Sequence, residues 1–186
     1  MLFAVGDGNH SLATAKACYE ELKAKGADAD SLARARYAMV ELENIMDESQ
    51  KFEPIHRIIN DCKAMSLLTY LGESCCAEAG YPIRWISGVH EGKMYLDKRK
   101  GVLPIAILQN ALDDYLSSHA GEIDYIHGED SLRELAAKPG SIGFVLESVP
   151  KDDFFRGIAQ DGVLPRKTFS MGEAQEKRYY IEARKI

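Results

Sequence analysis

The first clear hydrophobic pattern lies at the start of the chain. An apolar run at positions 1–5 is typical of a buried strand, and it ends at a glycine-containing turn over positions 6–9. Beyond the turn, apolar residues recur at spacings of three and four, which predicts a helix over 9–25 with a stripe formed by Leu12, Ala15, Tyr19 and Leu22. Gly26 can end that helix in a left-handed conformation. The expected order is therefore strand, tight turn, helix.

The middle of the chain changes between strand and helix patterns. Residues 36–45 show a partial alternation that favours a strand, whereas 62–71 have the periodicity of a helix. Two runs at 83–86 and 93–96 flank a glycine-containing turn and predict a β-hairpin. Pro104 suits the first turn of the next helix, whose buried stripe comprises Ile105, Leu108, Leu112 and Leu116.

The last third of the chain predicts a compact β-α-β unit. Residues 123–126 and 142–146 favour strands, and the Ser131 and Glu134 pair has the spacing of a capping box that opens a short helix between them.

A further helix is expected to follow the β-α-β unit and to stop at Gly162, before a final strand over 178–183. No repeat, low-complexity tract or Pro/Gly-rich linker separates these segments. Together the elements predict an α+β fold, with a mixed sheet, packed helices and a C-terminal β-α-β unit. Residues 1–186 are expected to form a single unit.

Composition and charge narrow the class of protein. The 186 residues are 46% hydrophobic and 28% charged, as in an ordinary globular domain. Asp and Glu number 29 against 23 Lys and Arg, so the net charge of -6 argues against a nucleic-acid partner. The four cysteines have no C-x-x-C spacing, and neither a membrane span nor a secretory signal is recognisable. We therefore expect a cytoplasmic protein with reduced thiols and no membrane partner.

The turn at the start of the first helix is the strongest chemical signal. Glycines let a ligand approach the backbone closely, and the N–H groups at a helix start favour a phosphate or carboxylate. This predicts ligand contacts from Gly6, Gly8, Asn9 and Ser11. Asp7 could bind a metal or act as a base, and His10 could transfer a proton or donate to a phosphate. The alternative is structural, with Asp7 or Asn9 as an N-cap and His10 as an ordinary polar side chain.

Two further clusters of polar residues are candidates. His56 and Arg57 follow Pro54, whose fixed φ orients the chain, and such a pair suits an anionic ligand. Alternatively, Arg57 makes a structural ion pair and His56 packs at the rim of the core. A basic segment near the C-terminus offers cations and hydroxyls that could bind phosphate, namely Arg166, Lys167, Thr168 and Ser170. Its alternative is a solvated loop. The other histidines, His90, His119 and His127, lack zinc-ligand spacing.

Three motifs in the same order resemble a bacterial family, catalogued as domain of unknown function one thousand and fifteen and often labelled ParB-like. Residues 6–16, Gly-Asp-Gly-Asn-His-Ser-Leu-Ala-Thr-Ala-Lys, resemble its Asp-Gly-His-His-Arg-x-x-x-Thr-Ala element. Residues 53–57 resemble its Pro-x-His-Arg element, and residues 164–170 its Pro-x-Lys-Ser/Thr-x-Phe element. In the family the first motif lies well inside the chain. The resemblance therefore implies that this sequence is the C-terminal part of a longer member.

The ParB-like label implies nucleotide phosphate binding at the first motif, as in ParB and sulfiredoxin-type domains. Two positions depart from that pattern. Ser11 stands where the family has an arginine, which removes a bidentate phosphate donor, and Asn9 stands where sulfiredoxins carry their reactive cysteine. Sulfiredoxin chemistry is thereby excluded.

The leading hypothesis is a protein that binds a phosphorylated small molecule or a nucleotide with Mg²⁺, as a ParB/sulfiredoxin-like phosphotransferase. Asp7 would hold the metal or act as base, His10 and His56 would be catalytic, and Arg57 and Lys167 would hold phosphate oxygens. The alternative from another class is a non-catalytic regulatory or nucleic-acid-associated module, which the acidic charge disfavours. A third hypothesis is a structural domain that has lost its ligand-binding site.

Overall fold

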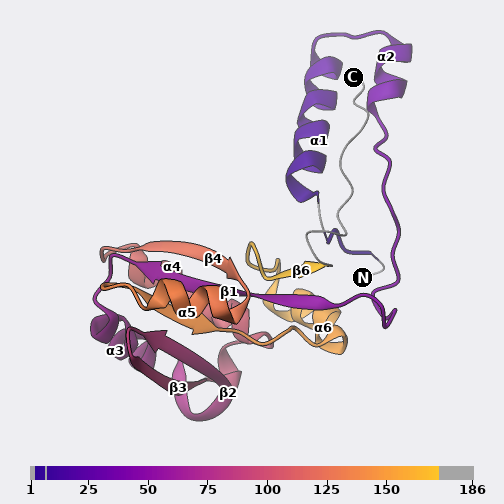
Figure 1. Ribbon diagram of the computed structural model, residues 1–186. Helices are drawn as coiled ribbons and strands as arrows, with labels where there is room; N and C mark the ends of the chain where they lie inside the picture. Colours follow the sequence, from indigo (N-terminus) through magenta and orange to yellow (C-terminus); the bar gives the residue numbers. More distant parts are fainter. Residues whose placement is uncertain (1–2, 7, 172–186) are drawn as a thin grey trace. The chain divides into compact units, whose positions relative to one another are not determined.

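The computed structural model describes residues 3–6 and 8–171. The chain forms two compact units (Figure 1), of which the first holds the described residues up to Ile45 and the second begins at Met46. Two expectations, the role of Asp7 and the strand over 178–183, lie outside the described residues.

The first unit contains α1 (Asn9–Ala24) and α2 (Ala29–Ala35). The predicted first helix is confirmed, and the four residues of its expected stripe are half-buried while most of its other positions are exposed. Gly26 ends it with a φ of 72°, and its N–H donates to the carbonyl of Lys23 at 3.1 Å. The predicted left-handed cap is thus confirmed, because glycine adopts this conformation without steric cost.

Two expected strands in the first unit are wrong. Residues 3–6 and 37–44 form neither helix nor strand. The apolar residues of the second segment are exposed, namely Tyr37, Met39, Val40 and Leu42. An alternating pattern becomes a strand only when a neighbouring backbone supplies its hydrogen bonds, and none of the described strands pairs with this segment.

The second unit is built around a sheet. Its elements in chain order are β1 (Phe52–Asn60), α3 (Ala64–Ser74), β2 (Cys76–Ser87), β3 (His90–Leu96), a short 3-10 helix (Lys98–Lys100), α4 (Pro104–Leu116), β4 (Glu122–His127), α5 (Glu129–Ala136), β5 (Ile142–Val145), α6 (Lys151–Asp161) and β6 (Phe169–Met171). The predicted hairpin, the helices beginning near residues 62 and 104, and the helix ending at Gly162 are confirmed.

The sheet has six strands in the order β3-β2-β5-β1-β4, and β6 pairs with the start of β1. The α+β class is confirmed. Every described pairing is antiparallel, where we expected a mixed sheet. The predicted β-α-β unit exists in split form, because β4 and β5 both pair with β1 and lie on its two sides. The central strand β1 is therefore the element that sequence patterns missed.

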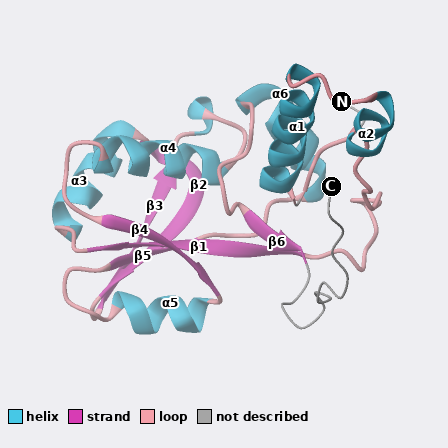
Figure 2. Ribbon diagram, turned by 90° about the horizontal axis from the view of Figure 1, so that it is seen from above, coloured by secondary structure: helices cyan, strands magenta, loops and turns pink. Residues whose placement is uncertain are grey.

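Helices cover both faces of the sheet (Figure 2). Helix α5 packs on one face through a small core of Ile58, Ile86, Leu132, Ala136 and Val145. Helices α3 and α4 cover the other face, where the larger core includes Ile59, Leu67, Leu71, Leu108, Leu112 and Phe144. Because successive strand residues point to opposite faces, neighbouring residues of β1 serve different layers.

Glycines set two tight connections in the second unit. Gly88, with a φ of 60°, starts a two-residue turn between β2 and β3, as in a type II′ hairpin. Gly128, with a φ of 85°, leads from β4 directly into α5. Helix α5 consequently begins at Glu129, and Ser131 lies inside it. The predicted capping box is wrong for this reason.

Three aromatic rings hold the start of β1 against α6 and β6. The rings of Phe52 and Phe169 stack with centroids 4.3 Å apart, and Phe154 lies 5.7 Å from each. Such contacts add to the apolar area that the rings bury. They keep the C-terminal motif beside the strand that carries His56 and Arg57.

Candidate functional site

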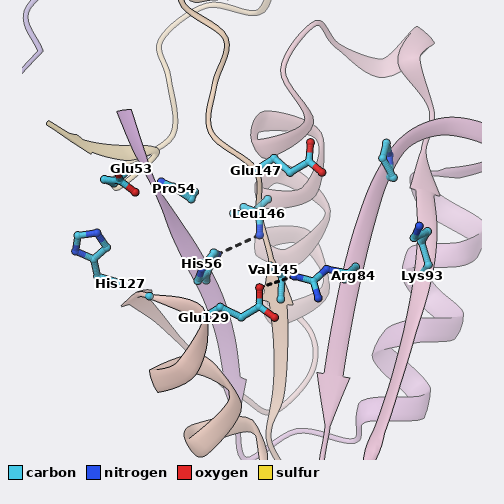
Figure 3. A pocket seen from close by; sticks show the side chains of 12 residues that line it. Glu53, Pro54, His56, Arg84, Lys93, His127, Glu129, Val145, Leu146 and Glu147 are labelled. Atoms are coloured by element: carbon cyan, nitrogen blue, oxygen red, sulfur yellow. Dashed lines mark hydrogen bonds and ion pairs between the residues drawn. The ribbon is translucent and has the colours of Figure 1, made fainter. Parts of the chain in front are cut away.

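A pocket of about 750 Å³ opens on the sheet face that α5 covers in part (Figure 3). Strands β1, β2, β3 and β5, the end of β4 and the first turn of α5 all contribute to it. Its lining is mostly polar and comprises Glu53, Pro54, His56, Pro82, Arg84, Lys93, His127, Gly128, Glu129, Val145, Leu146 and Glu147. The pocket lies entirely within the second unit.

Strand register arranges the floor of the pocket as one row. Arg84 pairs with Lys93 on one side and with Val145 on the other. Because Arg57 pairs with Phe144, His56 lies level with Val145. Directly opposed residues of antiparallel strands point to the same face. The row therefore consists of Lys93, Arg84, Val145 and His56, which lie side by side on β3, β2, β5 and β1.

His56 is held as a neutral hydrogen-bond donor. The side chain is only 4% exposed, and the backbone N–H of Leu146 donates to its Nδ1 atom at 3.1 Å. Because an N–H can only donate, Nδ1 is unprotonated and the ring proton is on Nε2. Burial lowers the pKa of His56, and the opposing effect of Glu129 is smaller. At neutral pH the ring thus offers an N–H group to a ligand.

An ion-pair network connects the floor of the pocket with α5. The Arg84 guanidinium donates to the Glu129 carboxylate, which also accepts from Arg133 at 2.9 and 3.1 Å. Arg133 in turn contacts Glu91 at 3.1 Å. The hydrogen bond from Arg84 is the main reason that the pKa of Glu129 lies below its usual range. With Lys93 beside Arg84, three cations here face two carboxylates.

The opposite wall of the pocket is acidic. Glu53 precedes His56 on β1, and Glu147 follows the end of β5 (Figure 3). Glu53 is half-buried and Glu147 is exposed. In the described part of the chain, neither carboxylate forms a hydrogen bond or an ion pair. The charged groups are therefore separated, with cations on β2 and β3 and free carboxylates beside β1 and β5.

Arg57 does not line the pocket. Adjacent to His56 on β1, it points to the opposite face and is 0% exposed. Its guanidinium donates to the Gln109 side chain at 2.7 Å, to the Ile55 carbonyl at 2.7 Å and to the Arg166 carbonyl at 3.1 Å. It also lies over the Tyr125 ring, 4.6 Å from the centroid. Arg57 therefore has a structural role, as the alternative to ligand binding predicted. Its hydrogen-bond partners are neutral groups, where we expected an acidic side chain.

The C-terminal motif meets this buried arginine. The Arg166 Nε donates to the Tyr125 hydroxyl at 3.0 Å, and the buried Thr168 hydroxyl donates to the Pro165 carbonyl at 2.5 Å. Lys167 is exposed and has a φ of 56°, unusual for a residue with a side chain. The structure thus brings the motif at residues 53–57 into contact with the motif at residues 164–170. None of these three C-terminal residues is part of the pocket lining.

The N-terminal motif belongs to the first unit. Gly8, with a φ of 82°, is the N-cap of α1, and none of the described side chains caps this helix. The other described residues of this motif that were predicted to bind or react are exposed, namely Gly6, Asn9, His10 and Ser11. Their expected roles stay predictions, as does that of Asp7. Of the predicted site residues, His56 alone lines the pocket in the described chain.

Sequence patterns missed most of the pocket's charged residues, which are Glu53, Arg84, Lys93, Glu129 and Glu147. One signal was present. With the hairpin predicted and a two-residue turn at Gly88, Arg84 falls opposite Lys93. Two like charges facing each other on an exposed sheet face destabilise a hairpin unless an anion lies between them. The acidic wall has no such signal, because it depends on strands from distant segments.

The fold and the pocket define an α+β protein with a polar pocket on its sheet. The chain belongs to the family described as Protein of unknown function (DUF1015), whose model matches residues 1–182. The ParB-like label and the expectation that the chain is a C-terminal part stay predictions. No curated protein and no solved structure matches the chain.

Two features of the described residues bear on metal binding and on membrane insertion. They contain no group of three or more His, Cys, Asp and Glu side chains placed to hold a metal ion. None of the helices in this part of the chain has the length and apolarity that a bilayer crossing needs.

Proposed function

We propose that this protein binds a small phosphorylated molecule, with its anionic group in the pocket against Lys93, Arg84 and His56. The observation that carries the proposal is the row of donors on one sheet face, where two cations lie directly opposite each other and line the same cavity as a buried imidazole. The proposal keeps the ligand class that the motifs predicted. The proposed binding site for the anion is the pocket on the sheet of the second unit, whereas the motifs predicted the turn at the start of the first helix.

Charge supports an anion at this place. Arg84 and Lys93 repel each other across the hairpin, and Glu129 shares its charge between Arg84 and Arg133. Among the described residues, the positive charge of Lys93 is left without a carboxylate. A phosphate oxygen beside Lys93 would offset that charge and accept hydrogen bonds from ammonium and guanidinium groups, which are stronger than neutral ones.

His56 supports binding more directly than proton transfer. With Nδ1 occupied by the Leu146 N–H, the ring donates from Nε2 and cannot accept a proton at Nδ1 unless that bond breaks. A neutral donor of this kind suits a phosphate oxygen. The start of α5 at Gly128 and Glu129 also lines the pocket, and backbone N–H groups at a helix start add a favourable field for an anion.

Calorimetry on the full chain tests the proposal. The ligands are inorganic phosphate, hexyl phosphate as a simple monoester and adenosine monophosphate as a nucleotide, titrated into the wild type and into Lys93→Gln. Loss of the ammonium should weaken binding by about threefold to tenfold. Lys138→Gln is the matched control, because Lys138 is exposed beyond the end of α5 and outside the pocket.

Arg84→Gln is less informative, because it also breaks the ion pair with Glu129. Failure of all three ligands to bind would refute the proposed function. Equal weakening by Lys93→Gln and Lys138→Gln would refute the assigned place, since it would show only a general charge effect.

A further inference from the structure

We infer that the ligand is dipolar, with an amine or another cationic group about 10 Å from its phosphate; this inference rests on the proposed function. The pocket has one wall of cations and one wall of unpaired carboxylates, and both contribute to the same cavity. A ligand with a single negative end would satisfy the first wall and be repelled by the second.

The geometry of the sheet gives the separation of the two walls. Glu53 lies three residues before His56 on β1, and Glu147 lies two residues beyond Val145. Because β1 and β5 are antiparallel, both offsets run in the same direction from the row of donors. At a rise of about 3.3 Å per residue, these offsets along the strands correspond to roughly 10 Å for Glu53 and roughly 7 Å for Glu147. The two carboxylates therefore lie on one side of the pocket, away from α5.

The two carboxylates are available to a ligand. In the described chain they make no ion pair, whereas Glu129, the third acid of the lining, is engaged by two arginines. Glu53 is half-buried, which strengthens its attraction for a cation relative to a fully solvated acid. Figure 3 shows Glu53 and Glu147 on the same side of His56 and Glu129 on the other. An ammonium group of the ligand would pair with these carboxylates, as no cationic side chain of the described residues does.

Three synthetic phosphates provide the test, each titrated by calorimetry into the full chain. Aminohexyl phosphate carries an amine that can reach the acidic wall when its phosphate lies at the row of Lys93, Arg84 and His56, whereas hexyl phosphate lacks the amine. Phosphoethanolamine carries the amine on too short a chain. We expect aminohexyl phosphate to bind about threefold to tenfold tighter than either of the others.

The double variant Glu53→Gln and Glu147→Gln should abolish that advantage while hexyl phosphate binds as well as before or better. Glu73→Gln, an exposed acid on α3 outside the pocket, is the matched control and should leave the advantage unchanged. Thermal melting confirms that each variant is folded.

The outcomes separate the two proposals. If aminohexyl and hexyl phosphate bind equally and both depend on Lys93, the dipolar ligand is wrong and the anion site stands. An amine advantage that survives the double variant also overturns the inference, because the amine would then contact something else. If no phosphate binds, the proposed function itself fails.

Discussion

Replacing Arg57 by Met distinguishes a structural arginine from a ligand-binding one. Motif resemblance predicted a phosphate contact for this residue, whereas the structure buries it completely on the face away from the pocket. Its guanidinium donates to three acceptors, two of them backbone carbonyls. Met has a similar length and keeps the apolar packing, so the substitution removes mainly the charge and the hydrogen bonds.

The expected cost follows from two opposing contributions. Leaving the two buried acceptors without a donor costs about 2 kcal/mol each, and the part-buried Arg166 carbonyl adds about 1 kcal/mol, which gives roughly 5 kcal/mol. Burial lowers the pKa of Arg57 to about 10, and the Tyr125 and Asp113 groups oppose that shift. A depression of this size corresponds to roughly 3 kcal/mol of desolvation that Met does not incur. The net loss of unfolding free energy is therefore about 2 kcal/mol.

Urea unfolding of the full chain measures this loss. Arg57→Lys keeps the charge but has a single donor group, so an intermediate loss is expected. Arg156→Met is the matched control, because its guanidinium is exposed and, among the residues that the structure describes, pairs only with Asp153 within α6. Such a pair contributes less than about 1 kcal/mol.

The result that refutes the reasoning is a variant as stable as the wild type. If Arg57→Met unfolds within about 1 kcal/mol of the wild type and has lost phosphate binding, Arg57 contacts the ligand as the motif implied. If it is destabilised by the expected amount and still binds phosphate when folded, its role is to hold β1 against α4 and the C-terminal turn.

Three further predictions follow from single contacts. Because folding lowers the pKa of His56, the unfolded chain binds more protons than the folded chain below about pH 6.5, and the free energy of unfolding should fall with acid by up to about 1.4 kcal/mol per pH unit. His56→Asn keeps an acceptor for the Leu146 N–H and should flatten this pH dependence when urea unfolding is measured between about pH 7.5 and pH 5. The control variant His90→Asn should leave the pH dependence unchanged. A Cβ on Gly80 would lie 1.9 Å from the Leu96 carbonyl oxygen, so Gly80→Ala should lower the melting temperature markedly, and an unchanged melting curve would contradict the β2–β3 geometry. Asp161→Ala removes the carboxylate that accepts the N–H groups of Val102 and Leu103 before α4 at 2.7 and 3.1 Å, and calorimetric unfolding should show a loss of about 1 kcal/mol that Asp161→Asn partly restores.

Local patterns determined the helices and the hairpin. The stripe of α1 and its glycine cap, Pro104 at the start of α4 and the hairpin around Gly88 all depend on residues within one or two turns of each other. Such elements can be predicted because the side chains that stabilise them are close in sequence. The α+β class follows from their number and order.

Only the tertiary structure decided the central strand and the site. Strand β1 is covered on both faces, so its side chains lack the alternation that marks a half-buried strand, and its hydrogen bonds come from β4, β5 and β6. The His56–Arg57 pair was recognised as chemically important, but strand geometry directs one side chain to the pocket and the other into the core.

The pocket is likewise a product of strand order. Lys93, His56 and Glu147 lie far apart in sequence and share one cavity only because β3, β2, β5 and β1 are neighbours in that order. Charge and residue type can be read from the sequence, whereas the separation of cations from carboxylates depends on pairings between distant segments, which no local pattern encodes.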